Sequence, residues 1–369
     1  MRIVITGADG FIGRNLVVRL KELGHTDLVG ITLESTAAEW QGALKAANFV
    51  FHLAGVNRPK DASEFATGNA ELTDEVCRLL ADAGNAAPVV LSSSTQAELD
   101  NPYGRSKRAA EDAVFRHGEK TGAPTYVFRL TNVFGKWSQP NYNSAVATFC
   151  HNVARGLPIT INDPTAPLRL VYIDDVMGAF VRLLDTSQPS GFVGAEPEYL
   201  TTVGDVAKAI VGFADSRKSM LTERVGTGLM RALYSTYLSF LSPESFSYEV
   251  PCHTDPRGVF VEMLKTPDCG QFSYFTAHPG VTRGEHYHHT KTEKFLVIRG
   301  TAQFAFRHIV TGERYELLAR GGEGRIVETV PGWTHNITNV GDEEMIVMLW
   351  ANEIFDREHP DTVAMKVRP

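Results

Sequence analysis

Two residues capable of acid–base chemistry stand four positions apart in the stretch Pro-Tyr-Gly-Arg-Ser-Lys at 102–107. If this stretch begins a helix, Tyr103 and Lys107 share one face of it. An ammonium group beside a phenol favours the phenolate and lowers the pKa of the phenol. Such a tyrosine can give a proton to a reacting oxygen or take one back. A serine at the end of the preceding apolar run, 89–94, could hydrogen-bond the same oxygen.

The C-terminal third of the chain carries a second reactive group, which is rich in histidine. Eight of the twelve histidines follow residue 250. His286 and His288 alternate, so on a strand they point to one face, and we expect Glu293 on the neighbouring strand of a hairpin. His335 follows a Pro-Gly turn and is expected at a strand edge. Three imidazoles and a carboxylate that converge inside a barrel form a site for a first-row divalent metal; exposed histidines on a hairpin are the alternative.

The N-terminal residues supply a turn suited to a nucleotide. Residues 2–6 are predicted as a buried strand, and a helix follows Gly7, Gly10 and Gly13. Glycines let the backbone approach a pyrophosphate, and the helix N-terminus offers free N–H groups and a positive dipole end. The G-x-x-G-x-x-G spacing is one residue longer than the common G-x-G-x-x-G. Strand, turn and helix together predict a dinucleotide site rather than a plain glycine-rich turn.

The next two predicted strands bear on the identity of the cofactor. The second, 28–33, ends without the acidic residue that would bind the ribose 2′-hydroxyl of NAD, although Glu34 is close. Arg14 could bind a 2′-phosphate, which favours NADP. The alternative is that Arg14 is an ordinary surface residue of the helix. The third strand, 48–55, ends in small residues that let the backbone lie along the cofactor, and its His52 is expected to be structural.

The rhythm of the sequence changes near residue 245. Before it, strands alternate with helices, which predicts a Rossmann-type doubly wound parallel sheet in an α/β domain at 1–245. After it, short apolar runs between glycine and charged turns predict an all-β antiparallel barrel or jelly roll at 246–369. The predicted barrel strands include 259–262, 271–275, 294–298 and 302–306. Clustered aromatics at 233–240 are expected to serve packing.

Composition excludes several classes of protein. The chain of 369 residues has a net charge of -7 and no Lys/Arg stripe, which argues against nucleic acid as a partner. No apolar run reaches the roughly 18 residues that a membrane span needs. The chain starts at once with a strand, so no signal peptide is expected. Four scattered cysteines (Cys77, Cys150, Cys252 and Cys269) are expected to be reduced thiols. We therefore expect a cytoplasmic protein.

Six motifs follow one another in a fixed order in the first domain. They are the glycine turn, His-Leu-Ala-Gly at 52–55, Leu-Ser-Ser-Ser at 91–94, Tyr103-x-x-x-Lys107, Arg-Leu-Thr-Asn-Val-Phe-Gly at 129–135 and Val-Tyr-Ile-Asp-Asp-Val at 171–176. Together they resemble an extended short-chain dehydrogenase/reductase acting on a nucleotide sugar, over roughly residues 1–240. Residues 95–102 form a shorter insert between serine and tyrosine than in many relatives, so the wall of the substrate pocket is expected to differ.

This resemblance implies a set of site residues. The catalytic set would be Ser94, Tyr103 and Lys107, with Ser93 as the alternative to Ser94. Asn132 and Arg169 would help to hold the nucleotide diphosphate. The implied contacts to NADP(H) come from Gly7, Gly10, Phe11, Ile12, Gly13, Arg14, Leu53, Ala54, Gly55, Asn69, Tyr103 and Lys107.

The second domain resembles the cupin double motif, over about residues 250–369. Its first half is Gly280-x5-His286-x-His288-x4-Glu293-x6-Gly300, and its second is Pro331-Gly332-x2-His335-x3-Asn339. Pro331 directly precedes Gly332, where many cupins have a residue between them, and the ligand geometry is expected to survive that shift. We predict one divalent metal ion, zinc, held by His286, His288, Glu293 and His335.

The whole chain is similar to the bifunctional capsular-polysaccharide enzymes of the CapF/WbjC type. The motifs are at 100–104, 134–137, 140–144, 233–238 and 288–291. The resemblance implies a UDP-activated 4-keto amino sugar as substrate, whose C3 is epimerised in the cupin domain. The C4 ketone is then reduced with NADPH to the 6-deoxy-N-acetyl-L-talosamine nucleotide, on the way to N-acetyl-L-fucosamine. Both folds commonly pair with themselves, so we expect a homodimer.

Several roles in the cupin domain stay open at this point. His289, Lys291 and Tyr287 are candidates for the acid and base of an epimerisation, although regular alternation along a strand would turn Tyr287 and His289 away from the metal. A structural role for the metal is the alternative. The same ligands also suit an iron oxygenase. In a third reading, the chain is a single NAD(P)-dependent reductase or epimerase, and its cupin is only a binding or dimerisation module.

Overall fold

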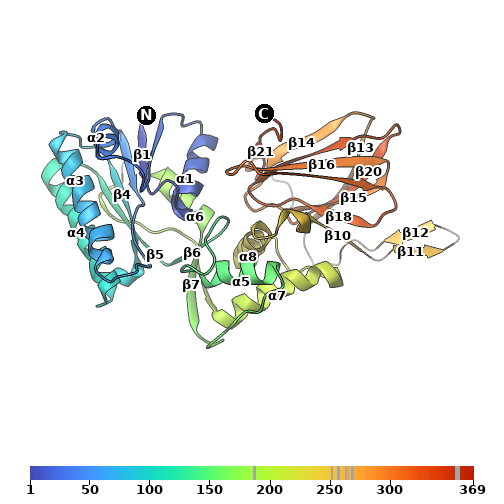
Figure 1. Ribbon diagram of the computed structural model, residues 1–369, viewed down its shortest axis with the longest axis horizontal. Coiled ribbons are helices and arrows are strands. Elements are labelled where there is room, and N and C mark those ends of the chain that lie inside the picture. Colours follow the sequence, from blue (N-terminus) through green and yellow to red (C-terminus); the bar gives the residue numbers. More distant parts are fainter. Residues whose placement is uncertain are drawn as a thin grey trace. The chain divides into compact units, whose positions relative to one another are not determined.

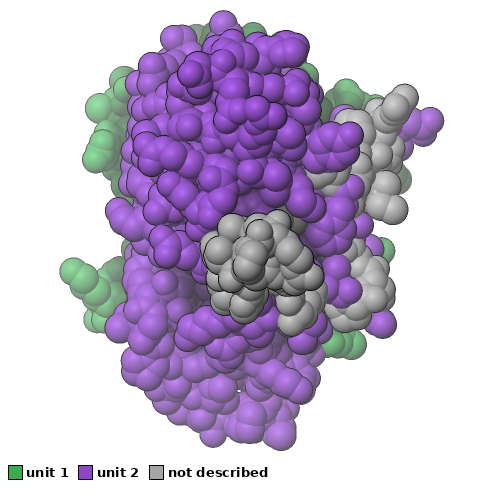
Figure 2. Space-filling model, turned by 90° about the vertical axis from the view of Figure 1, so that its right-hand side faces the viewer, with its two compact units in different colours: residues 1–134, 141–144, 168–200 green, residues 135–140, 145–167, 201–369 purple. Residues whose placement is uncertain are grey.

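The computed structural model describes residues 1–185, 188–250, 252–255, 258–261, 264, 266, 270–353 and 358–369 (Figure 1). Two compact units divide the chain, and Figure 2 shows them in green and purple. Unit 1 comprises residues 1–134, 141–144 and 168–200, and unit 2 comprises residues 135–140, 145–167 and 201–369.

Unit 1 is built on a six-stranded sheet whose assigned ladders are all parallel. In sheet order its strands are β2 (Leu28–Ile31), β1 (Ile3–Thr6), β3 (Phe49–His52), β4 (Val89–Ser94), β5 (Thr125–Leu130) and β8 (Gly191–Phe192). Because β1 lies between β2 and β3, the winding direction reverses beside it. Ligands of such sheets bind outside the carboxyl ends of the strands at this switch point.

Helices cover both faces of this sheet (Figure 1). In chain order the helical elements are α1 (Phe11–Glu22), α2 (Ala37–Lys45), the π-helix η1 (Ala66–Glu71), α3 (Leu72–Asp82), the 3-10 helix η2 (Thr95–Glu98), α4 (Pro102–Thr121) and α6 (Ile173–Arg182). Leu44, Val76 and Val114, from α2, α3 and α4, join one core with residues of the strands. Phe180 of α6 packs against Phe51 and Phe128, whose strands it covers from the opposite face.

The start of α4 follows from its sequence. The Asn101 side chain caps the helix by accepting a hydrogen bond from the Gly104 N–H at 2.7 Å. Pro102 occupies the first turn, where no N–H is needed, and Gly122 ends the helix with a φ of 76°. The predicted helix through Tyr103 and Lys107 is therefore confirmed.

A smaller sheet, which lies mostly in unit 1, and three helices of unit 2 precede the barrel in the sequence. The sheet contains β6 (Asn132–Phe134), β7 (Pro167–Tyr172) and β9 (Glu198–Thr202). The helices are α5 (Ala145–Ala154), α7 (Val203–Ser219) and α8 (Gly228–Ser239), followed by the 3-10 helix η3 (Pro243–Phe246). Tyr234 and Tyr237 of α8 pack on Phe213 of α7. The prediction that the aromatic cluster serves packing is confirmed.

The rest of unit 2 contains two five-stranded antiparallel sheets. In sheet order, the first contains β10 (Ser247–Glu249), β18 (Arg325–Glu328), β15 (Glu293–Arg299), β20 (Met345–Ala351) and β13 (Gln271–Ala277). The second contains β17 (Arg314–Arg320), β16 (Thr301–His308), β19 (Trp333–Asn339), β14 (Thr282–Tyr287) and β21 (Val363–Ala364). A separate hairpin pairs β11 (Cys252–Asp255) with β12 (Gly258–Val261). Phe295 of the first sheet contacts Phe304 of the second, with ring centroids 5.7 Å apart.

The predicted fold class is confirmed, since a parallel α/β sheet precedes antiparallel β-sheets. One detail of the barrel was wrong. Glu293 does not lie on a hairpin partner of β14, because β14 and β15 belong to different sheets. His335 lies near the start of β19, which runs between β16 and β14. Loops in this fold cross between sheets, so closeness in sequence does not imply strand pairing.

Two other expectations are only partly covered by the structure. Residues 201–245 belong to the same compact unit as the barrel, and the domain boundary near residue 245 stays a prediction. Cys77 and Cys150 are buried free thiols. Cys269 and Glu262 lie outside the described residues, as does the side chain of Cys252.

Candidate active sites

The glycine turn after β1 closes tightly on itself and on the end of β3. A Cβ on Gly13 would lie 2.1 Å from the Gly7 carbonyl oxygen, and one on Gly7 would lie 2.9 Å from the Ala54 backbone. Gly7 also has a φ of 65°, which side chains disfavour. Phe11 and Ile12 begin α1 half-buried, and Arg14 is exposed just behind them. The turn that leads into α1 thus lies against the predicted cofactor loop 53–55. This is the arrangement in which the N–H groups at a helix N-terminus bind the pyrophosphate of a dinucleotide.

A buried hydroxyl fixes that cofactor loop. Thr6 Oγ1 accepts hydrogen bonds from the N–H groups of Leu53, at 3.2 Å, and Ala54, at 3.1 Å. The same oxygen lies 2.7 Å from Nδ1 of His52, whose Nε2 lies 3.0 Å from Thr73 Oγ1. Burial, helped by the charge of Lys107, lowers the pKa of His52 to about 3. His52 is therefore a neutral structural side chain, in line with the sequence prediction.

Asn69 connects the cofactor loop to the helix that carries the tyrosine. It is buried in η1, and π-helical turns are frequent at functional sites. Its amide accepts from Val56 N–H at 2.9 Å and donates to Val56 O at 2.8 Å and to Ser106 Oγ at 3.0 Å. Ser106 in turn donates to the Tyr103 carbonyl at 2.8 Å. Asn69 thus positions both the loop and the first turn of α4.

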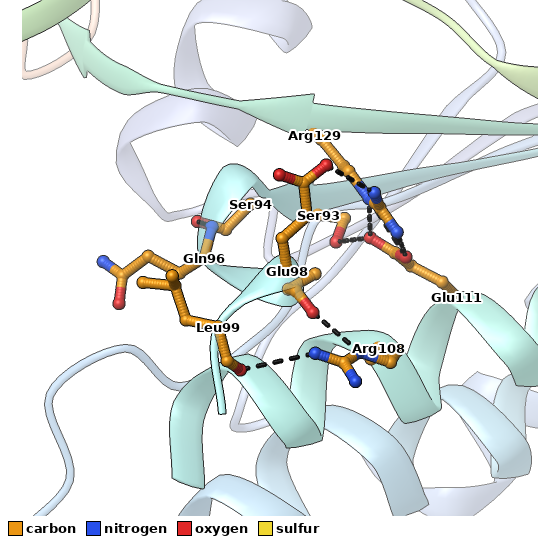
Figure 3. A network of polar contacts seen from close by, with 9 residues as sticks. Ser93, Ser94, Gln96, Glu98, Leu99, Arg108, Glu111 and Arg129 are labelled. Atoms are coloured by element: carbon orange, nitrogen blue, oxygen red, sulfur yellow. Dashed lines mark hydrogen bonds and ion pairs between the residues drawn. The ribbon is translucent and has the colours of Figure 1, made fainter. Parts of the chain in front are cut away.

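The two candidate serines face different partners. Ser93 Oγ donates to Glu111, which forms a 2.6 Å ion pair with Arg129. Figure 3 shows Ser93 directed at this pair, whereas Ser94 lies beside Gln96. Ser94 hydrogen-bonds the Tyr103 side chain, which lowers the pKa of that phenol. The geometry therefore favours Ser94 over Ser93 as the partner of Tyr103.

The ionisation of Tyr103 differs from the sequence expectation. Burial raises its pKa, Ser94 lowers it, and Tyr142 raises it again. Lys107 is itself buried, donates to Ser92 O at 2.7 Å, and has its pKa lowered to about 8 by burial against the opposing effect of Glu111. The predicted lowering of the phenol pKa was therefore wrong, because the loss of water around Tyr103 outweighs the hydrogen bond from Ser94. A neutral phenol is the form that donates a proton.

The two residues predicted to hold a nucleotide diphosphate lie on paired strands. Asn132 Nδ2 donates to the backbone carbonyl of Arg169 at 3.0 Å. The Arg169 guanidinium forms a 2.6 Å ion pair with Glu198 and is more than half exposed. Both side chains therefore lie at the surface of unit 1, where an anion can reach them.

The four predicted metal ligands of unit 2 converge. One ligand atom from each of His286, His288, Glu293 and His335 lies within 4.8 Å of all the others. His286 and His335 are register partners on β14 and β19. Glu293 enters from the other sheet and places Oε2 3.3 Å from His288 Nε2 and 3.6 Å from His335 Nε2. The ligand atoms from the two sheets thus lie together at one site.

The protonation states of this cluster suit a cation. Burial, together with His335 and His288, lowers the pKa of His286 to about 3, and burial lowers the pKa of His335. Burial alone would raise the pKa of Glu293, but His288 and His335 bring it well below its usual value. Both ring nitrogens of His335 are buried without a hydrogen-bond partner among the described residues. The lowered pKa values leave His286 and His335 neutral and Glu293 ionised, and zinc binds these groups in those forms.

Asp361 was missed by sequence reasoning. Its carboxylate accepts the backbone N–H groups of His289, Thr290 and Lys291 at 2.8, 2.6 and 2.7 Å. Its backbone carbonyl lies 2.5 Å from His288 Nδ1. A carbonyl can only accept, so it fixes the proton on Nδ1 and leaves Nε2 for a metal. No spacing signal exists for Asp361, because it lies some 70 residues beyond the loop it holds.

The three candidate acid–base residues beside the cluster separate in space. Lys291 Nζ lies 3.0 Å from Glu293 Oε1, so it reaches the ligand cluster. Tyr287 is buried, and its ring packs against His289 with centroids 5.6 Å apart. Tyr287 and His289 therefore contact each other, while Lys291 is the candidate in contact with a ligand.

Both halves of the chain match known families. Residues 3–193 match the NAD dependent epimerase/dehydratase family, and residues 253–363 match the polysaccharide biosynthesis C-terminal domain. A protein of Pseudomonas aeruginosa (strain PA103), named UDP-2-acetamido-2,6-beta-L-arabino-hexul-4-ose reductase, is 58% identical over 100% of this chain and 99% of its own. The structure of the capsular polysaccharide assembling protein CapF from Staphylococcus aureus is 38% identical with a TM-score of 0.69, and 100% of both chains align. The chain belongs to the CapF family.

A second CapF structure supports the same assignment. It contains the inhibitor 3-isopropenyl-tropolone, is 36% identical, and aligns over 100% of both chains with a TM-score of 0.63. Membership of the CapF family therefore covers the parallel-sheet unit and the barrel together. Within the described residues, none of the helices combines the length and the apolar character that crossing a bilayer requires.

Proposed function

We propose that this CapF-family chain is a bifunctional UDP-sugar enzyme of capsule or O-antigen synthesis. The barrel epimerises C3 of a UDP-2-acetamido-2,6-dideoxy-4-hexulose. The parallel-sheet unit then reduces the C4 ketone to UDP-2-acetamido-2,6-dideoxy-L-talose, on the route to UDP-N-acetyl-L-fucosamine. The name of the 58% identical relative, a UDP-hexul-4-ose reductase, supports this substrate class. The observation that carries the two-step proposal is that each unit has its own constellation: Ser94 beside Tyr103, and four metal-type ligands within 4.8 Å.

Three residues carry the reduction in this proposal. Bound NADPH would supply the hydride to C4. Tyr103, kept neutral by burial, gives its proton to O4, and the hydroxyl of Ser94 holds that oxygen. A Cβ on Gly55 would lie 3.7 Å from Lys107 Nζ, so this ammonium lies beside the cofactor loop and can support the phenolate left on Tyr103.

The choice of NADP rests on the end of β2. Residues 32 and 33 there are threonine and a fully exposed leucine, so no carboxylate stands directly after the strand to bind a ribose 2′-hydroxyl. Arg14 is exposed behind the glycine turn, where it can pair with a 2′-phosphate. The absence of the acid and the presence of the cation favour NADP over NAD.

The epimerisation uses the acidity of the carbon next to a ketone. The C3–H bond breaks, its electron pair moves toward the C4 carbonyl, and a proton returns to the opposite face of C3. A divalent cation held by His286, His288, Glu293 and His335, zinc in our proposal, would supply Lewis acidity to the ketone oxygen. In this proposal Lys291 moves one proton, which its 3.0 Å distance from Glu293 supports, and His289 is the candidate for the other. The homodimer predicted from the sequence stays part of this proposal.

Deuterium exchange separates the two activities. In deuterated water without NADPH, the wild-type protein should exchange the C3 proton of the 4-keto sugar, and it should do so without oxygen. His288→Ala should stop this exchange, whereas His278→Ala, at an exposed histidine of the same unit, should not. Tyr103→Phe should stop NADPH oxidation and leave the exchange intact.

Three results would contradict the proposal. Exchange by His288→Ala at the wild-type rate would reduce the barrel to a binding or dimerisation module of a single reductase. Loss of both activities in Tyr103→Phe would contradict two separate sites. Exchange that requires oxygen would favour oxygenase chemistry at the four ligands.

A further inference from the structure

One cation shares the barrel pocket with three of the four ligands. The pocket is open to solvent, and apolar side chains from both sheets form most of its wall. These side chains are Phe275, Phe295, Phe304, Phe306, Ile337 and Leu349. His286, Glu293 and His335 also line it. Among the described lining residues, Arg283 is the one with a permanent positive charge, and neither the proposed epimerisation nor the sequence motifs use it.

A β-bulge places this arginine in the pocket. Along β14, Arg283 faces Ile337, Gly284 faces Asn336 and His286 faces His335, so Glu285 is an extra residue. Positions 283 and 286 are three apart and would point to opposite faces of a regular strand. The extra residue shifts the alternation, and both side chains line the pocket.

The bulge is held in a strained backbone by its own contacts. Gly284 has a φ of 100° and Glu285 a φ of 60°. The Glu285 carboxylate accepts from Asn336 Nδ2 at 2.6 Å and from the Val367 N–H at 2.7 Å. A non-glycine residue with positive φ persists only where its surroundings impose it. The contacts of Glu285 thus stabilise the bulge that brings Arg283 and His286 to the same pocket.

The Arg283 guanidinium is oriented but still accessible. It stacks over the Phe275 ring, with 4.9 Å from its central carbon to the ring centroid. One of its nitrogens donates to Thr276 O at 3.1 Å. The residue is exposed, so the rest of its planar fork of N–H donors can pair with an anion. Arg283 and His286 lie opposite Ile337 and His335, which are two residues apart, so their Cα atoms are separated by roughly 7 Å.

We propose that Arg283 binds the diphosphate of the sugar nucleotide while the sugar ring lies against the ligand cluster. The subsite rests on the proposed epimerisation for the identity of the sugar, and its anion chemistry rests on Arg283 itself. The barrel then recognises UDP independently of Asn132 and Arg169 in unit 1. The full chain accordingly has two places for a nucleoside diphosphate.

Equilibrium binding of UDP to the full chain tests the subsite without turnover. The wild type should bind two UDP molecules per chain, and Arg283→Gln should bind one in the same concentration range. Arg314→Gln removes the same charge from an exposed position of β17 that does not line the pocket, and it should still bind two. Wild type that binds a single UDP, or Arg283→Gln that binds two, overturns the inference whether or not exchange occurs.

The exchange assay gives a second readout. In Arg283→Gln, the UDP-sugar concentration that gives half-maximal C3 exchange should rise roughly 10- to 100-fold, with zinc content unchanged. Arg283→Lys should recover part of the loss, since it keeps the charge but not the fork. Loss of one UDP site together with no exchange in the wild type would refute the proposed reaction and retain the subsite. Unchanged half-saturation in Arg283→Gln, in a protein that exchanges, would refute the subsite and retain the reaction.

Discussion

Asp361 offers a sharp test of how the barrel positions its metal ligands. Its carboxylate accepts three backbone N–H groups of the loop 289–291 and the hydroxyl of Thr290, at 2.6 to 2.9 Å. This loop lies between His288, which directly follows β14, and Glu293, which begins β15. Replacing Asp361 by alanine removes the shared acceptor and leaves its donors unpaired in a partly buried site. The loop should then loosen between two ligands.

The size of the effect follows from these bonds. A hydrogen bond to a charged group contributes about 1.5–3 kcal/mol, and bonds that share one acceptor are not additive. We therefore expect Asp361→Ala to lower the free energy of unfolding by about 3–5 kcal/mol. Misplacing a partner of a ligating histidine typically costs about 10- to 100-fold in metal affinity. Asp361→Asn keeps one acceptor oxygen and the side-chain shape, so it should lose less of both.

Zinc affinity, measured by competition with a chromophoric chelator, and urea unfolding of the metal-free protein provide the assay. Asp342→Ala removes an exposed aspartate of the same unit and serves as the control. Asp361→Ala that keeps zinc affinity within about twofold of wild type, at unchanged stability, would refute the positioning role.

Two further predictions concern unit 1. Lys107→Met should abolish NADPH oxidation yet raise the free energy of unfolding by about 1–2 kcal/mol at pH 7, because it removes a buried charge and leaves one carbonyl unpaired. The Lys107 pKa, about 8 in the folded state, lies below its unfolded value, so wild-type stability rises with pH from about 8 to about 10.5. The difference in free energy of unfolding between Lys107→Met and the wild type, measured in urea, should therefore become smaller as the pH rises through this range. A difference that grows with pH would contradict a buried charge at Lys107. Ser94→Ala should lower kcat about 10- to 1,000-fold with little change in stability. Ser93→Ala should lower the free energy of unfolding by about 1–2 kcal/mol and leave kcat near the wild-type value. The reverse pattern would show that Ser93, not Ser94, binds the reacting oxygen.

Many features of this protein can be predicted from short, contiguous stretches of its sequence. The strand, glycine turn and helix at the N-terminus predict a dinucleotide site, because hydrophobic period and glycine spacing are local properties. The change from alternating strands and helices to short strands predicts a parallel sheet followed by antiparallel ones. The three histidines and the glutamate whose ligand atoms lie within 4.8 Å of one another could also be identified from their order and spacing in the sequence.

Only the tertiary structure decided how these residues face one another. Glu293 reaches the histidines from the opposite sheet, and Asp361 holds their loop from far along the chain. One extra residue at Glu285 brings Arg283 into the pocket, which a strict alternation of side chains would have excluded. Burial reverses the pKa shift expected for Tyr103. In each case the cause is a contact or a loss of water contributed by distant residues, whereas the sequence determined which residues have the chemistry.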